Sequence, residues 1–459
     1  MIHIIEAALS RVAVALRKGE VSSLELVEEA LRRHQEVGER LHAYKHLDVD
    51  GARAAARTAD QLLAGGDDTL PFCGIPISVK DLYGARGLPT FAGTARQLPD
   101  AWSEDAWLVA RLREQGAVVM GKTHTVELAY GAVGINPHWG TPWNPWDDEV
   151  HRIPGGSSCG AGVSLHEGSA LVALGTDTGG SIRIPASMTG VVGHKTTKGR
   201  WPTTGVVPLS TTLDTVGALT RSVEDSAYFF GAVDPAWGDS GAFLEHLSDQ
   251  RWEDVRVAVP RCGIWDDCQT DIADVIHGAL SDLEPAVRLT DVDGGLLDEA
   301  GHLYMNGGIA GAECRAFLDA ELPGWLDILH PTVGLRLAGA PALSSERYAE
   351  SMAARDSMVS AAPTLFDGAD LLALPTTIIT PPSVAELHDH ERYLQTNASA
   401  LRPTCPVSML GLCAVTIPVG FDGAGMPVGL QLVAPGGADE RLLGAALALE
   451  RVLGTPRTS

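Results

Sequence analysis

The sequence predicts an α/β protein: a single compact domain in which helices cover both faces of a central mixed β-sheet. Short apolar segments of strand length alternate with amphipathic segments of helical length along most of the chain. This alternation is typical of a layered α/β fold. No internal repeat, low-complexity tract or linker divides the 459 residues, which favours one domain over several.

The N-terminal segment 1–70 is expected to form a helical layer. Residues 1–20 are apolar at helical spacing, and Glu6 interrupts them early, which favours an amphipathic first helix over a signal peptide. Ser22 and Glu25 form a capping box at the start of the next helix, and residues 50–63 add another.

The catalytic core is expected over residues 71–230. Residues 75–79 predict a buried strand that ends at Lys80. Further on, we predict a helix over 104–115 with Ser103 as its cap, then strands over 117–120 and 170–174. The same strand–helix–strand order returns at 255–259, 271–283 and 287–289.

The C-terminal part first becomes helical and then returns to strands. Residues 296–365 are mostly helical with Gly and Pro breaks, and we expect a subdomain there that lines the substrate entrance. Apolar strands follow at 371–374, 413–418 and 428–433, and the last helix is expected over 439–453. We expect these late strands to pair with the β-sheet that the earlier strands form.

Composition excludes several classes of partner. A net charge of −24 argues against nucleic acid or an anionic membrane, because both bind a basic face. No segment approaches the roughly 18 consecutive apolar residues of a membrane span. Seven cysteines without metal-type pair spacing indicate reduced thiols, so we expect a cytoplasmic protein. We expect its partner to be a small-molecule substrate. The sequence does not determine whether the protein forms a homodimer.

The stretch 155–183, GGSSCGAGVSLHEGSALVALGTDTGGSIR, carries two glycine–serine turns. Such a turn sets a hydroxyl beside bare backbone N–H groups, as a nucleophile requires, although a single turn is more often a surface loop. The second turn, 179–181, follows a strand that is expected to be buried. Its N–H groups, from Thr178 through Gly179 and Gly180 to Ser181, can converge on an oxyanion.

A nucleophilic serine also needs a base, and Lys80 is the candidate. Burial at the end of an apolar strand lowers the pKa of an ammonium group, so the neutral amine becomes available near neutral pH. Serine–lysine pairs are a known variant of the catalytic triad. The nearest histidines are His166 and His194, and His194 fits equally well as the end of a strand.

Three blocks in this order resemble the amidase signature family: PISVKD with Lys80, the GGSS turn, and GTDTGGSIRIPA followed by GVVGHKTTKGR. The resemblance continues to the C-terminal GLCAVTIPVGFDGAGMPVGLQLVA. It implies amide hydrolysis without a metal or cofactor by a Ser–cis-Ser–Lys triad, with Ser181 as nucleophile, Ser157 as bridging serine and Lys80 as base.

The chain departs from the family pattern near these blocks without touching the triad. Cys159 and Ala161 replace the more usual glycine or serine residues, and His194, Lys195 and Thr196 replace leucine, lysine and proline. Cys159 lies beside the first turn, where packing is a more common role than reactivity.

Residues beside the triad suggest supporting and competing sites. Asp177 and Arg183 flank the second turn, and we expect them to form a buried polar support together with Ser158. GSSCG also matches the nucleophile elbow of α/β-hydrolase esterases with Ser158 as nucleophile, but a proline and glycines stand where a buried strand is required.

The sequence pattern of a phosphate-binding loop is absent. His388 and His390 could bind a metal, but their polar neighbours favour a solvated loop.

The substrate is the least determined part of the prediction. Tyr130 and Trp139 are the candidate substrate-binding residues, although packing in the core is the commoner role for any one ring. The expected activity is hydrolysis of a carboxylic amide, carbamate or hydrazide, with an apolar, aryl-bearing substrate preferred. The alternatives are the ammonia-releasing A subunit of a tRNA-dependent amidotransferase and a non-catalytic binding homologue. The aromatic residues between Lys80 and the first turn are Phe91, Trp102, Trp107, Tyr130, Trp139, Trp143 and Trp146.

Overall fold

The computed structural model describes residues 2–66, 69–250, 252, 255–339 and 345–454. Within them, eleven strands form one mixed sheet in the order β1-β3-β2-β4-β6-β5-β10-β11-β9-β7-β8. The strands are β1 Tyr44–Leu47, β2 Pro76–Lys80, β3 Val118–Thr123, β4 Val172–Asp177, β5 Val192–Lys195, β6 Thr215–Thr220, β7 Arg256–Arg261, β8 Arg288–Asp293, β9 Leu371–Pro375, β10 Cys413–Phe421 and β11 Pro427–Ala434. The predicted fold class, one α/β domain around a mixed sheet, is confirmed.

Parallel pairing places the ends of two central strands together. Strand β2 runs parallel to both β3 and β4, whereas β4 pairs antiparallel with β6. The carboxyl ends of β2 and β4 therefore meet at one edge of the sheet. Residues that follow these two strands lie close together although about 100 positions separate them in sequence.

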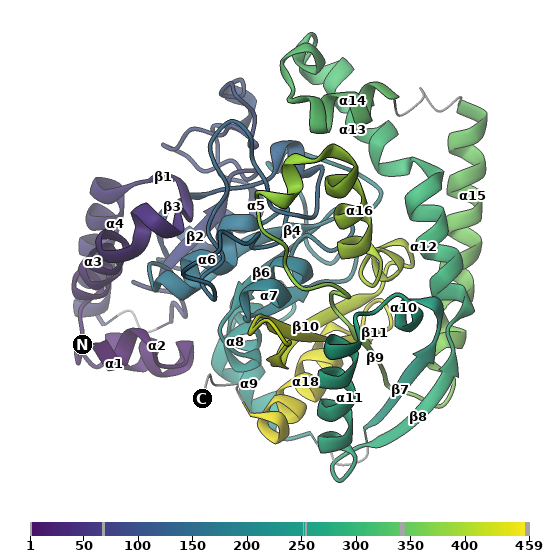
Figure 1. The fold of residues 1–459 in the computed structure, drawn as a ribbon. Helices are drawn as coiled ribbons and strands as arrows, with labels where there is room; N and C mark the ends of the chain where they lie inside the picture. The colour runs from purple at the N-terminus through teal and green to yellow at the C-terminus, as the bar shows by residue number, and fades with distance from the viewer. Residues whose placement is uncertain (1, 67–68, 251, 253–254, 340–344, 455–459) are drawn as a thin grey trace.

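Helices surround this sheet (Figure 1). In that view α1 to α4 lie at the β1 end, while α12 and α15 pack together at the other side of the molecule. The helices are α1 Ile2–Ile5, α2 Leu9–Arg17, α3 Ser23–Leu41, α4 Val49–Ala64, α5 Trp107–Glu114, α6 Cys159–Glu167, α7 Arg183–Thr189, α8 Val223–Val233, α9 Ser240–Ser248, α10 Gly263–Asp266, α11 Thr270–Leu283, α12 Gly295–Gly307, α13 Ile309–Glu321, α14 Pro331–Gly339, α15 Ser345–Ala361, α16 His390–Leu401, α17 Cys405–Met409 and α18 Asp439–Leu453.

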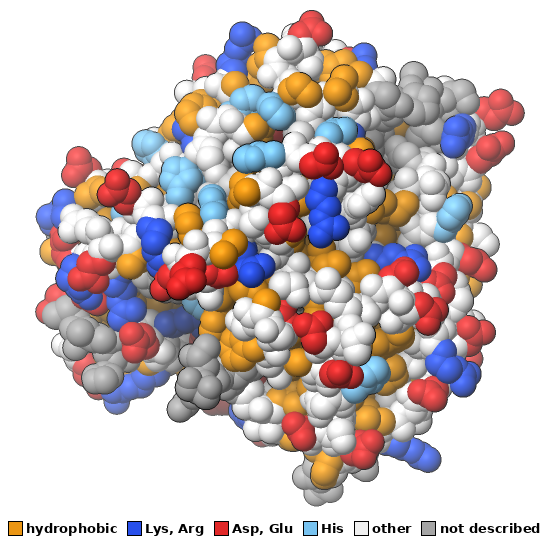
Figure 2. Space-filling model, viewed as in Figure 1, with side chains coloured by type: hydrophobic (Ala, Val, Ile, Leu, Met, Phe, Trp, Pro, Cys, Tyr) orange, Lys and Arg blue, Asp and Glu red, His pale blue; other side chains and the backbone are white. Residues whose placement is uncertain are grey.

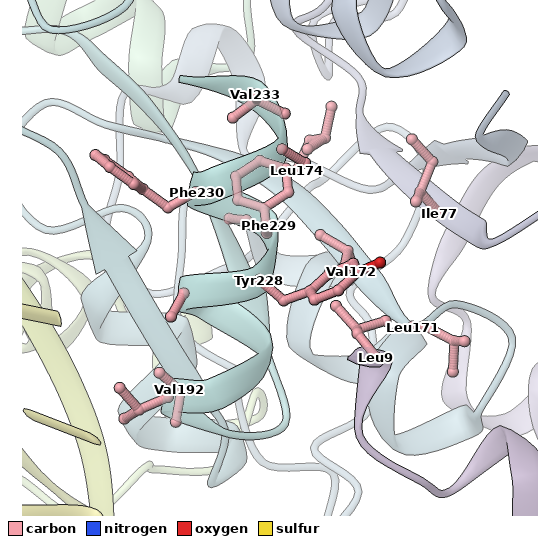
Figure 3. Packing of buried hydrophobic residues seen from close by; sticks show 14 of the residues in the cluster. Leu9, Ile77, Leu171, Val172, Leu174, Val192, Tyr228, Phe229, Phe230 and Val233 are labelled. Carbon is pink, nitrogen blue, oxygen red and sulfur yellow. The ribbon is translucent and has the colours of Figure 1, made fainter. Parts of the chain in front are cut away.

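The two faces of the sheet have different neighbours because successive side chains of a strand point to opposite sides. On one face, Ile77 of β2 and Leu174 of β4 belong to the same apolar cluster as Phe229 of α8 (Figure 3). On the other face, Ser78 of β2 lies 2.9 Å from Ser164 of α6, oxygen to oxygen. Lys80 lies two residues after Ser78 in the same strand, so its side chain points to the same, polar face of the sheet.

Two predicted helices have different limits in the structure. The first helix is interrupted after α1 because the backbone N–H of Leu9 donates to the buried Asp225 carboxylate of α8, at 2.6 Å, and starts α2 there. Helix α5 begins at Trp107 rather than at 104, because the N–H groups of Ala106 and Trp107 donate to loop carbonyls outside the helix. Ser103 follows a short 3₁₀ turn and does not cap α5.

The predicted start of α3 is confirmed. The capping box of Ser22 and Glu25 is present at the start of α3. Acidic and basic side chains are intermixed on the face in Figure 2, which does not form one continuous basic surface. Among the described residues, no helix combines the length and the apolar composition needed to cross a membrane.

Candidate active site

Lys80 ends β2 inside the molecule, with no exposed surface. Its ammonium nitrogen Nζ donates hydrogen bonds to Ser157 Oγ at 2.7 Å and to Thr176 Oγ1 at 2.8 Å. Burial lowers the pKa of Lys80 to about 7, and the more distant carboxylates of Asp177 and Asp214 oppose this only in part. A neutral amine is therefore accessible at physiological pH, in hydrogen-bonding contact with one of the predicted serines.

Ser157 lies in the first glycine–serine turn, between the loop at 125–134 and α6. The Gly156–Ser157 peptide bond is cis. The carbonyl oxygen of Ser157 accepts the Val126 N–H at 3.1 Å, which fixes the backbone on one side. Glycine is required at 156, because a Cβ there would lie 2.7 Å from the Gly134 nitrogen. Close approach of two backbone segments thus holds the hydroxyl against Lys80.

Ser181 lies in the second turn, directly after β4, and is buried. Its carbonyl oxygen accepts from the hydroxyl of Ser158 at 2.5 Å, so the two turns are joined next to Ser157. Gly180 has φ +142, and a Cβ there would clash with Thr404, whose hydroxyl donates to the Gly179 carbonyl at 2.6 Å. The turn is therefore restricted to glycine at this position.

Only some backbone N–H groups of the second turn donate hydrogen bonds to other protein groups. The N–H of Ile182 donates to the Asp177 carboxylate at 3.2 Å. Within the described part of the chain, the N–H groups of Gly179, Gly180 and Ser181 donate to no protein acceptor. The Thr178 hydroxyl donates to Asp214. Three adjacent backbone donors thus remain available to a ligand beside the Ser181 hydroxyl.

Asp177 and Arg183 form a fully buried ion pair at 2.8 Å that supports the turn. Burial raises the pKa of the Asp177 carboxyl, but the charge and hydrogen bonds of Arg183 outweigh burial and hold this pKa below its usual value. The guanidinium also donates to the Thr404 carbonyl at 2.9 Å, to Gln431 at 2.6 Å and to Ser408 at 2.8 Å. These contacts tie the turn to β11 and α17.

A cavity of about 120 Å³ opens beside Ser181. Its wall comes from the sheet side, from residues 129–131 and from α12, α13, α14 and α16. The Tyr304 ring packs so closely on the second turn that a Cβ at Gly179 would clash with its hydroxyl. The lining residues are Ala129, Tyr130, Gly131, Thr178, Ser181, Leu209, Tyr304, Met305, Gly308, Ala310, Gly311, Arg336, Asn397 and Leu401.

The structure gives the remaining candidates supporting positions. The Ser158 hydroxyl is occupied by the Ser181 carbonyl, and no strand precedes it, unlike the serine of a nucleophile elbow. Cys159 is fully buried, and burial raises the pKa of its thiol to about 12. A thiol in this state packs rather than reacts.

The histidines considered in the sequence have other contacts. His194 lies in β5, 3.7 Å from the Asp439 carboxylate and beside the Phe230 ring. His166 contacts the Thr189 carbonyl. Asp389, between the two histidines considered for a metal, caps α16 instead. No group of three or more His, Cys, Asp or Glu among the described residues is arranged to hold a metal.

Of the seven aromatic residues singled out in the sequence, Tyr130 lines the cavity. Trp139 lies outside it: its indole N–H donates to the Thr94 carbonyl at 2.7 Å, and the Lys45 ammonium lies 3.5 Å from its ring centroid. Two aromatic residues therefore line the cavity: Tyr130, which was predicted, and Tyr304, which was not. The basis for an aryl-bearing substrate is correspondingly weak.

Sequence reasoning missed the far wall of the cavity. Tyr304, Arg336 and Asn397 come from three helices that carry no recognisable motif, and each lies more than 100 residues after Ser181. Their shared location depends on how α12, α14 and α16 pack over the sheet edge. A single sequence contains no local signal for such packing.

Comparison with known proteins shows the family of this chain. The model of the Amidase family matches residues 25–443. A 2-amino-5-chloromuconic acid deaminase of Comamonas testosteroni is 45% identical over 97% of this chain and 96% of its own. The A subunit of the glutamyl-tRNA(Gln) amidotransferase of Acidothermus cellulolyticus is 33% identical over 98% of this chain and 95% of its own. The crystal structure of an amidase superimposes with a TM-score of 0.87 at 32% identity, covering 98% of this chain and all of that one.

The buried Lys80 contacts one serine turn, and the cavity opens beside the other. The chain belongs to the amidase family and is an enzyme that acts on carbon–nitrogen bonds other than peptide bonds.

Proposed function

We propose that this protein hydrolyses the amide of a small carboxylic acid through an acyl-enzyme on Ser181. The observation that carries the proposal is the 2.7 Å contact between the buried Lys80 amine and the Ser157 hydroxyl, beside a turn with three unused N–H groups. The cavity of about 120 Å³ favours a small substrate, because pockets for drug-sized ligands measure roughly 300–1,000 Å³.

The proton moves in a relay. The Ser181 oxygen attacks the carbonyl carbon and passes its proton to Ser157, whose own proton moves to neutral Lys80. The N–H groups of the 179–181 turn stabilise the resulting oxyanion. As the C–N bond breaks, Lys80 returns the proton through Ser157 to the leaving nitrogen. Water then attacks the Ser181 ester and gives up its proton through Ser157 to Lys80. As the ester bond breaks, the proton returns by the same route to the Ser181 oxygen and the acid is released.

Hydroxylamine is expected to intercept the acyl-enzyme. Because it is a better nucleophile than water, adding it during turnover of an amide such as succinamate should yield the matching hydroxamate. Mass spectrometry of the products measures this, with the Ser181→Ala variant as control. Turnover with no hydroxamate and no covalent adduct on the protein would rule out the acyl-enzyme.

The rate is expected to rise with pH through about 7. Below the pKa of Lys80, the amine is protonated and cannot accept the proton from Ser157, so kcat/KM should fall about tenfold per pH unit. Above this pKa the neutral amine predominates and kcat/KM should level off. Initial rates between pH 5 and 9 measure the profile, and Lys80→Ala should lose at least about 100-fold. A wild-type profile that is flat across pH 7 would remove Lys80 from the relay.

A second candidate is the release of ammonia from an amino-substituted unsaturated acid, the reaction named for the Comamonas relative. Identity of 45% over almost the whole chain favours it. Such a substrate can tautomerise to an imine, whose hydrolysis consumes one water and gives a ketone and ammonia without an acyl-enzyme. Product analysis separates the two: hydroxylamine gives a hydroxamate from the first reaction and an oxime from the second.

The ammonia-releasing component of a tRNA-dependent amidotransferase remains an alternative because of the 33% identity to such a protein. Glutamine carries an ammonium and a carboxylate, yet the described lining of the cavity contains one cation, Arg336, and no Asp or Glu. This composition favours an acid without an ammonium group. Ammonia release from glutamine by the purified chain tests the alternative directly.

A further inference from the structure

Arg336 is the single cation among the described residues that line the cavity. It belongs to α14 and forms part of the same cavity wall as Ser181. Its Nη1 donates to the Tyr130 carbonyl at 2.8 Å, and the guanidinium carbon lies 4.2 Å from the centroid of the Tyr130 ring. The side chain is therefore held in one orientation before any substrate binds.

No described carboxylate forms an ion pair with this guanidinium within 4.0 Å. The acids around the cavity have other partners. Glu127, three positions before Tyr130, accepts the His330 N–H at 3.0 Å with one oxygen and contacts His138 at 2.7 Å with the other. Burial also raises the pKa of Glu127 to about 8, so it is largely uncharged at neutral pH.

The Asn397 amide of the cavity wall is also a hydrogen-bond donor. Asn397 uses its oxygen to accept the Ala132 N–H at 2.8 Å, which leaves its NH₂ group to donate. The Tyr130 carbonyl accepts one N–H of Arg336, and the hydroxyls of Tyr130 and Tyr393 also interact with its guanidinium, so at least two of its five N–H groups remain for a ligand. A cavity with one cation, several donors and no anion complements a carboxylate, which is acceptor-only.

We propose that Arg336 is the specificity-determining residue that binds a substrate carboxylate remote from the bond that is cleaved. This inference rests on the proposed function and specifies its substrate class: monoamides of short dicarboxylic acids, without an ammonium group beside the carboxylate. Malonamate, succinamate, glutaramate and maleamate belong to this class. Glutamine does not.

The test compares each of these four acids with its methyl ester, which has nearly the same shape and no charge. For wild type, ammonia release should give a higher kcat/KM for at least one acid than for its ester. Arg336→Gln should lower kcat/KM for that acid by roughly 10- to 100-fold, mainly through KM, since a charge-assisted hydrogen bond is lost. The same variant should change the ester by less than about threefold, and Arg336→Lys should recover part of the loss.

Arg315→Gln is the matched control, because Arg315 is partly exposed on the neighbouring α13 and pairs with Asp319. It should affect neither substrate. Equal losses on acid and ester in Arg336→Gln, or a wild type that prefers none of the acids, would overturn the proposal.

Binding separates this proposal from the catalytic one. Calorimetry should show that the preferred acid binds to Ser181→Ala and binds at least about tenfold more weakly when Arg336→Gln is added. If Ser181→Ala still turned the acid over, the catalytic role of Ser181 would fail while the Arg336 result stood. Unchanged affinity in the double variant would instead overturn the role of Arg336 alone.

Discussion

Ser181→Ala is expected to lower kcat by at least about 10⁴-fold while the protein stays folded. The variant removes the oxygen that forms the bond to the substrate carbonyl, and neither Ser157 nor Lys80 can replace it at that position. The Ser181 backbone, whose carbonyl oxygen accepts from Ser158, is unchanged by the substitution. Steady-state ammonia release measures the loss, and circular dichroism confirms the fold.

Ser158→Ala is the matched control for this experiment, since both hydroxyls lie in the joined turns. It removes a hydrogen bond to the Ser181 carbonyl, so we expect a smaller loss of kcat than for Ser181→Ala. If Ser158→Ala proved the more damaging of the two, Ser158 would become the nucleophile and the elbow alternative would replace the proposed mechanism.

Arg183→Met is expected to destabilise the protein by about 3–5 kcal/mol, the range for breaking a buried ion pair on one side. It leaves the buried Asp177 carboxylate without its ion-pair partner and removes the hydrogen bonds to Ser408 and Gln431. Because Asp177 also accepts the Ile182 N–H, the second turn should loosen and kcat should fall as well. Urea denaturation followed by fluorescence measures the free energy of unfolding.

Arg256→Met gives the comparison for that measurement. Arg256 pairs with Asp370 at the same 2.8 Å, but its side chain is 43% exposed and solvent screens the charges. Its loss should cost about 1 kcal/mol or less. If both variants lost equal stability, burial of the Asp177–Arg183 pair would not be what makes it important.

The sequence was sufficient where the site depends on local geometry. Both serine turns lie within 29 consecutive residues, and their glycines stand where the structure has a close backbone approach or an unusual φ. Lys80 could be expected to be buried because it ends an apolar strand. These features depend on residues close together in sequence, so a single chain displays them.

The sequence was insufficient where contacts between residues far apart in the chain determine the structure. Helix α2 starts at Leu9 because of a carboxylate on α8, more than 200 residues away. Trp139 was predicted from its proximity in sequence to the first turn, but its indole points to the Thr94 carbonyl. Arg336 is one of many arginines in the chain, and only the fold distinguishes it from those on the surface.

The proposed catalytic residues and the other cavity-lining residues come from different parts of the fold, which affects how new activities can arise. The serines and Lys80 belong to the sheet edge, whereas Tyr304 and Arg336 belong to α12 and α14, within the helical segment 295–366. Exchanging that segment between relatives would alter which molecule is accepted and leave the bond-breaking groups in place. Laboratory evolution toward a different amide should therefore be most productive when its libraries are confined to α12 and α14.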